Sequence, residues 1–224
     1  MKYIKKITIC LTLLLFMTAC SSPSDSTSSS TQTSQNTYIQ DGDRILIAYF
    51  ASGENSEVDV ASSASVTQYQ GEPVGIVHAL ASMIQENTGG DIFSITTSVQ
   101  YPQSSDDVID YAQEEHDQDV RPELTSHIDN LDDYDVIFIG YPIWWYDLPQ
   151  VMYSFFDEYD FSGKTIIPFC THAGSRFSST IETIKELEPD ATVVEDGFTV
   201  SAQEVDTNSD ETATQVKEWI GSLE

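Results

Sequence analysis

Basic residues are scarce in this sequence. Nine lysines and arginines stand against 37 aspartates and glutamates, so the formal net charge is −28 at pH 7. So acidic a chain repels the phosphates of nucleic acid, and we exclude nucleic acid as a partner. Solvated acidic surface explains the charge more simply than an acidic docking site, and salt is expected to stabilise the chain by screening its self-repulsion.

A long hydrophobic run is also missing, because the apolar stretch from Ile7 to Met17 is too short to span a bilayer. Lysines precede it and small residues lead to Cys20, which is the pattern of a signal peptide. The run 16–20 resembles the lipobox of bacterial lipoproteins, in which the cysteine is acylated and becomes the new N-terminus. The alternative is a plain signal peptide with an incidental cysteine. We expect lipidation of Cys20 and an extracytoplasmic protein that touches the membrane only through its lipid anchor.

Cysteine is rare too, with three in the chain and no C-x-x-C pair. Cys10 would leave with the signal peptide and Cys20 would be acylated, so Cys170 would remain alone. An intrachain disulfide is therefore excluded in the mature protein, and stability must come from core burial. At the end of an expected strand, Cys170 is read as a small buried hydrophobe rather than a nucleophile.

Motifs of several enzyme classes are absent. The sequence has no Gly-x-Ser-x-Gly elbow of a serine hydrolase and no Gly-x-Gly-x-x-Gly fingerprint of a tightly held dinucleotide. The histidines at 78, 116, 127 and 172 lack metal-ligand spacing, so no metal site is expected.

Composition divides the chain into three parts. Residues 1–19 form the expected signal peptide, and residues 20–42 the lipidated cysteine with a linker rich in Ser, Thr, Gln and Asn. Residues 43–224 form the expected domain. Without residues 1–19 the chain would keep six basic residues against 37 acidic ones, a net charge of −31.

Within the domain, apolar runs rich in β-branched residues alternate with segments of helical period. This pattern is typical of a parallel sheet covered by helices on both faces. Strands are expected at 44–50, 91–96, 134–140, 164–170 and 197–201. Helices are expected at 75–88, 105–118, 148–159 and 177–187, with a last one beginning at Ser209 or Asp210. Right-handed crossovers then favour an α/β fold with a doubly wound, five-stranded parallel sheet of order 2-1-3-4-5. Pro168 cannot donate to a strand ladder, so a bulge or break is expected there.

Ligands of such sheets bind beyond the carboxyl ends of the strands, where the strand order reverses. The loop after the third expected strand, 140–149, is unusually aromatic, which indicates that a flat ligand stacks on it. The alternative is that Trp144 and Trp145 only fill the core. The loop 171–175 offers two hydroxyls, an imidazole and a glycine, which suit the polar edge of a ring.

The paired segments 140–145 and 168–175, with Lys164, resemble the flavodoxin-like family of small bacterial FMN proteins, as do 101–102 and 121–124. The resemblance covers about 44–224. It implies the flavodoxin fold, FMN as cofactor, and electron transfer or the reduction of a flavin or quinone. It places the flavin ring against one group of residues on each side: Pro142, Ile143, Trp144 and Trp145, and opposite them Thr171, His172, Gly174 and Ser175.

The phosphate loop departs from the family pattern, which has Tyr-Phe-Ser after the first strand and Gly-Asn-Thr at the first helix. This chain has Tyr-Phe-Ala at 49–51 and Gly-Ile-Val at 75–77. The expected phosphate contacts are therefore those that remain: Ser52, Gly53, Asn55, Gly75 and Ile76, with Ser65 or Thr67 as further candidates. Glu54 and Glu57 add negative charge where a phosphate would sit, and the loss of charge-assisted hydrogen bonds from the missing side chains would weaken FMN binding.

The sequence thus predicts an extracytoplasmic FMN protein that passes electrons to a redox partner or a small-molecule acceptor, with no side chain required as acid or base. The alternative is a flavodoxin-like binding or interaction module that has lost FMN.

Overall fold

The computed structural model describes residues 37–54, 66–102 and 105–224. The expected signal peptide, Cys20 and most of the expected linker lie outside these residues, as do Asn55 and Ser65. Residues 36–224 form one compact unit. It begins with Tyr38 and Ile39, whose backbone amides donate to the carbonyl oxygen of Leu223 at 2.7 and 3.2 Å.

The strands form a parallel sheet and a separate hairpin. The sheet has the order β4-β1-β5-β6-β7, with β8 also pairing with β6, and β2 pairs with β3 in the antiparallel hairpin. The bounds are β1 Ile45–Tyr49, β2 Val66–Tyr69, β3 Glu72–Gly75, β4 Asp91–Ser94, β5 Val136–Pro142, β6 Thr165–His172, β7 Thr192–Val193 and β8 Phe198–Ser201. The predicted α/β class and the order 2-1-3-4-5 are confirmed, with the last position shared by β7 and β8.

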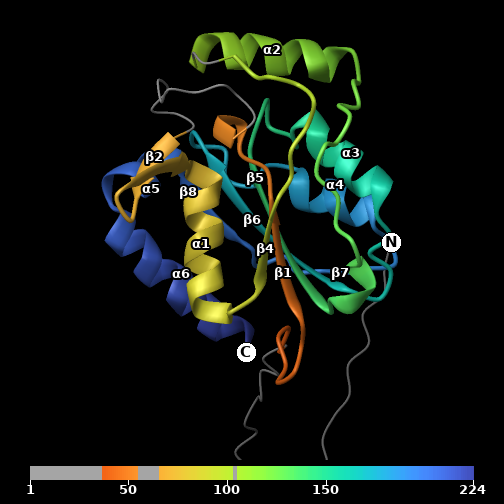
Figure 1. Cartoon of the computed structure of the whole chain (residues 1–224), viewed down its shortest axis with the longest axis vertical. Coiled ribbons are helices and arrows are strands. Elements are labelled where there is room, and N and C mark those ends of the chain that lie inside the picture. Colours follow the sequence, from red (N-terminus) through yellow and green to blue (C-terminus); the bar gives the residue numbers. More distant parts are fainter. Residues whose placement is uncertain (1–36, 55–65, 103–104) are drawn as a thin grey trace, which may run out of the picture. The chain divides into compact units, whose positions relative to one another are not determined.

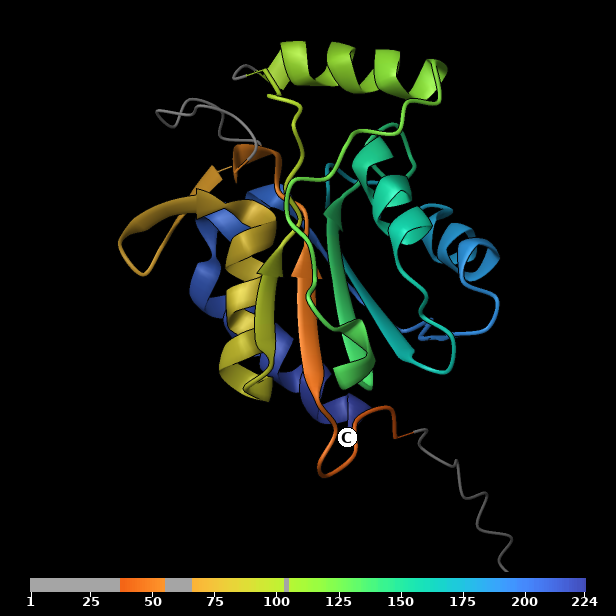
Figure 2. The same cartoon turned by 45° about the vertical axis from the view of Figure 1, so that its right-hand side comes forward.

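The helices follow the predicted segments closely. Their bounds are η1 Ser52–Glu54, α1 Ile76–Thr88, α2 Ser105–Asp117, η2 Leu131–Asp133, α3 Gln150–Glu158, α4 Thr180–Leu187, α5 Ala202–Thr207 and α6 Ser209–Leu223. Helices α1, α5 and α6 cover one face of the sheet, and α3 and α4 cover the other (Figures 1 and 2). The hairpin and α5 were not predicted.

Burial explains why the central strands read as continuous apolar runs. Residues 136–141 of β5 and 166–171 of β6 are all buried, because side chains on both faces meet helices. The core is therefore divided by the sheet into two clusters, one under α1 and α6 and the other under α3.

Pro168 interrupts the sheet on one side only. Strand β6 itself is continuous, and Pro168 pairs in register with Ile139 of β5. On the other side, β7 pairs with residues 165–166 and β8 with residues 169–172, so the break falls in the neighbouring strand opposite the proline. Gly197 crosses this gap, where a Cβ would lie 2.3 Å from the carbonyl oxygen of Pro168. The expected bulge in β6 is absent, since the missing donor faces the gap between β7 and β8.

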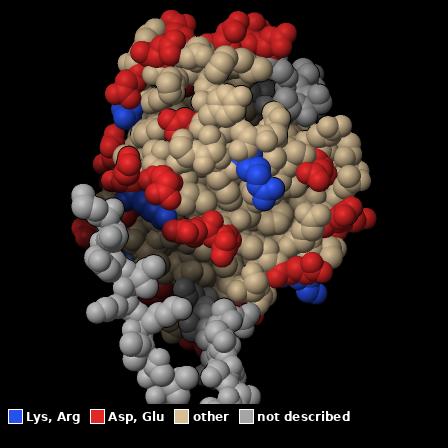
Figure 3. Space-filling view, turned by 180° about the vertical axis from the view of Figure 1, so that it is seen from behind, with Lys and Arg blue, Asp and Glu red and all other residues tan. Residues whose placement is uncertain are grey.

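Helix α2 lies across the carboxyl edge of the sheet rather than on either face (Figures 1 and 2). It carries acidic residues on its outer side, and Figure 3 shows acidic side chains spread over the back of the molecule with few basic ones among them. In the described part of the chain, no helix combines the length and apolar character needed to cross a membrane.

Candidate functional site

A cleft opens at the carboxyl edge of the sheet, beneath α2. We call it the rim cleft. Its volume is about 580 Å³, which lies within the range of small-molecule sites. Three segments line it: α2 with Val108, Ile109 and Ala112, the loop after β5 with Ile143, Trp144, Trp145 and Tyr146, and the loop after β6 with Ala173, Gly174 and Ser175. The structure thus brings the aromatic loop and the Gly-Ser loop together, as the strand order requires.

The two tryptophans of the aromatic loop have different surroundings. Trp144 is half-buried and meets Phe50 and Tyr101 edge to face, at ring-centroid distances of 5.6 and 5.3 Å. Trp145 is 44% exposed, and its indole Nε1 donates to the carbonyl oxygen of Ile109 on α2 at 3.0 Å. Trp144 is therefore anchored to the core by its aromatic neighbours while it lines the cleft, and Trp145 ties the loop to α2.

The backbone of this loop is strained. Trp145 and Tyr146 have φ values of 50° and 65°, a region that side-chain-bearing residues rarely adopt. Trp144 and Asp147 exchange backbone hydrogen bonds of 3.1 and 2.9 Å around them, which closes a tight turn. Positive φ at both central residues is typical of a type I′ turn, which usually takes Asn and Gly. Such strain persists where the surroundings enforce it, and it often marks functional sites.

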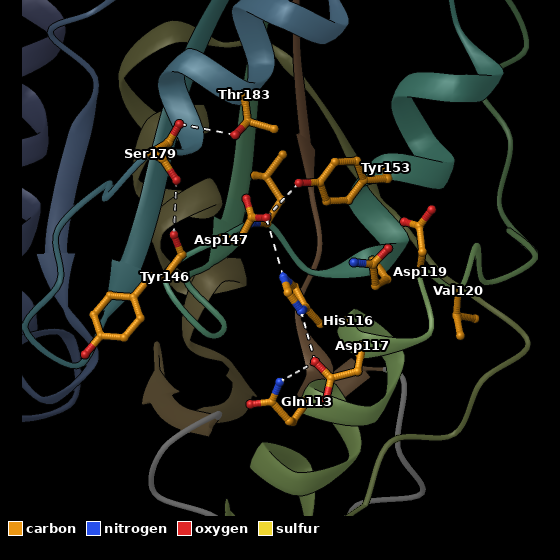
Figure 4. Close-up of polar contacts among 12 residues, drawn as sticks. Gln113, His116, Asp117, Asp119, Val120, Tyr146, Asp147, Tyr153, Ser179 and Thr183 are labelled. Carbon is orange, nitrogen blue, oxygen red and sulfur yellow. Dashed lines mark hydrogen bonds and ion pairs between the residues drawn. The ribbon is translucent and has the colours of Figure 1, made fainter.

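The side chain of Asp147, the last residue of this turn, connects the turn to two helices (Figure 4). Its Oδ2 accepts from the hydroxyl of Tyr153 on α3 at 2.8 Å and lies 4.0 Å from Nε2 of His116 on α2. From the other side, the hydroxyl of Ser179 donates to the carbonyl oxygen of Tyr146 at 3.4 Å. The backbone of this turn is consequently tied to α2, to α3 and to the N-cap of α4, while the Tyr146 ring stays exposed at the mouth of the cleft.

The loop after β6 is held by its own histidine. Nδ1 of His172 accepts from the backbone amide of Gly174 at 2.9 Å, and Gly174 has a φ of 121°, which favours glycine. Burial, followed by the nearby Arg176, lowers the pKa of His172, so its Nδ1 stays available as an acceptor. Thr171 is buried, and its carbonyl oxygen accepts from the amide of Ile143 at 2.8 Å. The residues that line the rim cleft therefore do not include Thr171, His172 or Pro142, and the contact of these three with a ligand stays a prediction.

Cys170 lies in the core, with no exposed surface, and its thiol is 3.3 Å from the hydroxyl of Thr199. Burial raises the pKa of Cys170 to about 12, which suits the expected structural role and not a nucleophile.

A second, smaller hollow of about 300 Å³ lies at the start of α1. We call it the α1 hollow. It is lined by Gly53, Glu54, Val66, Pro73, Val74, Gly75 and His78. Two of the expected phosphate contacts, Gly53 and Gly75, line the α1 hollow. Their sequence neighbours Ser52 and Ile76 are buried and do not line it. Asn55 lies outside the described residues. Gly75 is the N-cap of α1, as its predicted place at the helix start requires, and makes no side-chain capping bond.

The carboxylate of Glu54 is the polar group on which the hydrogen bonds of the α1 hollow converge. It accepts from the hydroxyl of Tyr49 at 3.0 Å and from that of Ser94 at 2.5 Å, and it contacts Nδ1 of His78. Burial acts to raise the pKa of Glu54, but the hydrogen bonds from His78, Ser94 and Tyr49 outweigh it and hold the pKa below its ordinary value. Glu54 is therefore an ionised carboxylate satisfied by three side chains.

Sequence reasoning missed the contribution of α2. Val108, Ile109 and Ala112 form its cleft-facing side, and Glu115 follows one turn later. Glu115 is 4% exposed, its Oε2 accepts from Tyr101 at 3.3 Å, and its Oε1 has no partner among the described residues. The apolar residues at 108, 109 and 112 in an otherwise acidic helix were the available signal, but the carboxylate of Glu115, one turn after residue 112, obscured it.

Comparisons with known proteins agree with this arrangement. The flavodoxin family model matches residues 68–223. A solved structure of a candidate flavoprotein from Bacteroides uniformis is similar at 26% identity and a TM-score of 0.61, covering 80% of this chain and 99% of that one. One from Bacteroides eggerthii has 23% identity and a TM-score of 0.60, covering 81% and 98%. A flavoprotein from Lactobacillus acidophilus, solved in complex with FMN, has 20% identity and a TM-score of 0.50, covering 75% and 99%. No curated protein sequence matches this chain.

Proposed function

Because this chain belongs to the flavodoxin family, we propose that it is a flavoprotein that holds FMN at the carboxyl edge of its sheet and transfers electrons. The rim cleft is the observation that carries the proposal. A flat aromatic ring fits between the Trp144–Trp145 loop and the Gly174–Ser175 loop, and the wall combines apolar side chains with the polar residue Ser175. The FMN complex of the Lactobacillus acidophilus relative supports the same cofactor.

The residues of the rim cleft have distinct tasks in this proposal. Ile143, Trp144 and Trp145 exclude water from one side of the ring, and Ser175, next to Gly174, offers a hydroxyl to its edge. When bound, the flavin supplies the redox chemistry, and the protein supplies orientation and local charge. Asp147 and the acidic surface disfavour a negatively charged reduced ring, which lowers its reduction potential.

The electron acceptor of the proposed flavoprotein is a redox partner or a small molecule such as a quinone or a free flavin. No side chain need act as acid or base in such a transfer. Tyr146 is 69% exposed at the mouth of the rim cleft and Trp145 is 44% exposed, so a partner would approach the ring over these residues.

A second candidate function rests on Glu54. An ionised carboxylate in the α1 hollow stands where the family pattern has hydroxyls for a phosphate. A binding or interaction module that has lost FMN and uses the rim cleft for another flat ligand would also have this feature.

Colour and fluorescence distinguish the two candidates. We expect the chain without residues 1–19 to quench the fluorescence of added flavin and to show a shifted flavin absorption spectrum. Reduction with dithionite followed by mixing with a quinone should then restore the oxidised spectrum. A titration with FMN and riboflavin that shows no quenching by either would reject the flavoprotein and leave the binding module.

We further propose that the protein is a lipoprotein anchored to the outer face of the cell membrane through Cys20. The basic start, the short apolar stretch and the lipobox-like run at 16–20 support this. Radiolabelled palmitate supplied to expressing cells should be incorporated into the wild-type chain and not into the Cys20→Ser variant. Equal labelling of both would overturn the assignment of the lipid to this residue.

A further inference from the structure

The α1 hollow contains its own anion. Helix α1 has 13 residues, its N-cap Gly75 makes no side-chain capping bond, and its first turn carries no acidic residue. The amides and dipole of a helix N-terminus favour a negative charge nearby. Glu54 supplies that charge from the neighbouring turn η1, where its carboxylate contacts His78, the third residue of α1.

Hydrogen bonds from three elements of the fold hold the carboxylate of Glu54 in place. Tyr49 at the end of β1, Ser94 at the end of β4 and His78 on α1 all bring polar hydrogen to it, so three separate elements converge on one side chain. The ring of Tyr49 also lies against that of His78, at a centroid distance of 5.2 Å. Moving Glu54 aside would leave these three groups without their acceptor.

The turn that carries Glu54 also leads to the rim cleft. Residues 50–54 run from Phe50, whose ring meets Trp144, to Glu54 in the α1 hollow. A flavin lying with its ring against Trp144 would therefore extend its ribityl chain along this turn. A phosphate at the end of that chain would meet an ionised carboxylate, which repels it, and the ring of His78 is already engaged by that carboxylate.

We propose that Glu54 takes the place of the flavin phosphate, so that this site binds flavin by its ring and does not favour FMN over riboflavin. The inference rests on the proposed function, since it assumes that a flavin occupies the rim cleft. The ligand class it assigns is a flavin recognised without its phosphate ester, and Glu54 is the residue that determines this specificity.

The test compares FMN with riboflavin in the chain without residues 1–19. Fluorescence titration should give the wild-type protein a Kd for riboflavin equal to or lower than its Kd for FMN. Glu54→Gln removes the charge and keeps most of the shape. It should tighten FMN binding at least tenfold and change riboflavin binding by less than about threefold, because only FMN carries the repelled group.

A matched control separates this local effect from the overall acidity of the chain. Glu72→Gln changes the net charge by the same amount at an exposed position of β3, three residues before the N-cap of α1. It should leave the ratio of the two Kd values unchanged. Should Glu54→Gln not fold, as judged by circular dichroism, Glu54→Ser tests the same expectation with a hydroxyl in place of the carboxylate.

The outcomes distinguish this inference from the proposed function. FMN binding at least tenfold tighter than riboflavin in the wild type, or the same Kd ratio in wild type and Glu54→Gln, would overturn the role of Glu54 while the flavoprotein stands. Absence of binding by both flavins in wild type and variant would overturn both.

Discussion

Two glutamates near the carboxyl edge of the sheet show opposite behaviour. Glu54, in the α1 hollow, accepts hydrogen bonds from Tyr49 and Ser94 and contacts His78, and these donors hold its pKa below the ordinary value although burial acts against them. Glu115, on α2, has a single donor, the hydroxyl of Tyr101, and burial raises its pKa to about 7. The number of donors, rather than burial alone, therefore decides which carboxylate is ionised at neutral pH.

The two shifts affect stability in opposite pH ranges. The folded state of Glu54 has a lowered pKa, so its contribution is complete above the ordinary value of 4.5 and is lost as the pH falls through the folded pKa. Glu115 has a raised pKa, so the fold is favoured below 4.5 and loses stability as the pH rises from 4.5 to about 7. Ionisation of Glu54 therefore stabilises the fold, whereas ionisation of Glu115 destabilises it.

The largest effect is expected from removing the charge of Glu115. Glu115→Gln should leave the free energy of unfolding nearly unchanged at pH 4, and should raise it by about 3 kcal/mol at pH 8, since burial raises the pKa of Glu115 from 4.5 to about 7 and each pKa unit corresponds to roughly 1.4 kcal/mol. Urea unfolding across this pH range measures the difference. The control is Glu114→Gln, an exposed neighbour on α2, whose effect should be small at every pH. A constant difference between Glu115→Gln and wild type would show that Glu115 does not titrate in this window.

Removal of the His78 side chain tests the Glu54 cluster in the α1 hollow, which consists of Glu54, Tyr49, Ser94 and His78. His78→Ala removes one of the three side chains that contact the Glu54 carboxylate, so we expect a loss of about 1.5–3 kcal/mol of stability at pH 7, as for a hydrogen bond to a charged group. FMN should also bind more weakly than in the wild type, because the phosphate then faces a carboxylate that keeps only the donors Tyr49 and Ser94. His127→Ala breaks the more exposed pair with Glu158 and should cost less than about 1 kcal/mol. Equal losses in the two variants would contradict the special role of the Glu54 cluster.

Most of the fold could be predicted because burial leaves a strong signal in the sequence. The runs at 134–140 and 164–170 are apolar on both faces, and the segments between strands have helical spacing that ends at Gly89 or Pro189. The hairpin β2–β3 was missed because Val66–Tyr69 and Glu72–Gly75 are short, and Gln70–Gly71 is a weak turn signal. Pro168 was read as a defect of its own strand because sequence does not reveal which side of a strand lacks a partner.

The site was predictable only where it follows strand ends. Trp144, Trp145, Gly174 and Ser175 meet at the rim cleft because parallel strands end at one edge. The side of the cleft formed by α2 was not predictable, since the position of residues 105–117 over that edge depends on tertiary contacts such as those of Tyr101. Glu54 could be recognised as a misplaced charge, but its pairing with His78 joins residues 24 positions apart that only the fold brings together.

The smallest effect concerns how α2 is held over the cleft. Trp145→Phe keeps an aromatic face and removes only the indole N–H that donates to the carbonyl oxygen of Ile109, so the expected loss of stability is about 1 kcal/mol or less. Hydrogen exchange should become faster in α2 and stay unchanged in β1 and α1. Trp219→Phe is the matched control, because it removes a similar bond, to the carbonyl oxygen of Asp196, on the face of the sheet that α6 covers. If α2 exchanges at the wild-type rate in Trp145→Phe, its apolar contacts at Val108 and Ala112 hold it without this bond, and Glu115 stays buried independently of the aromatic loop.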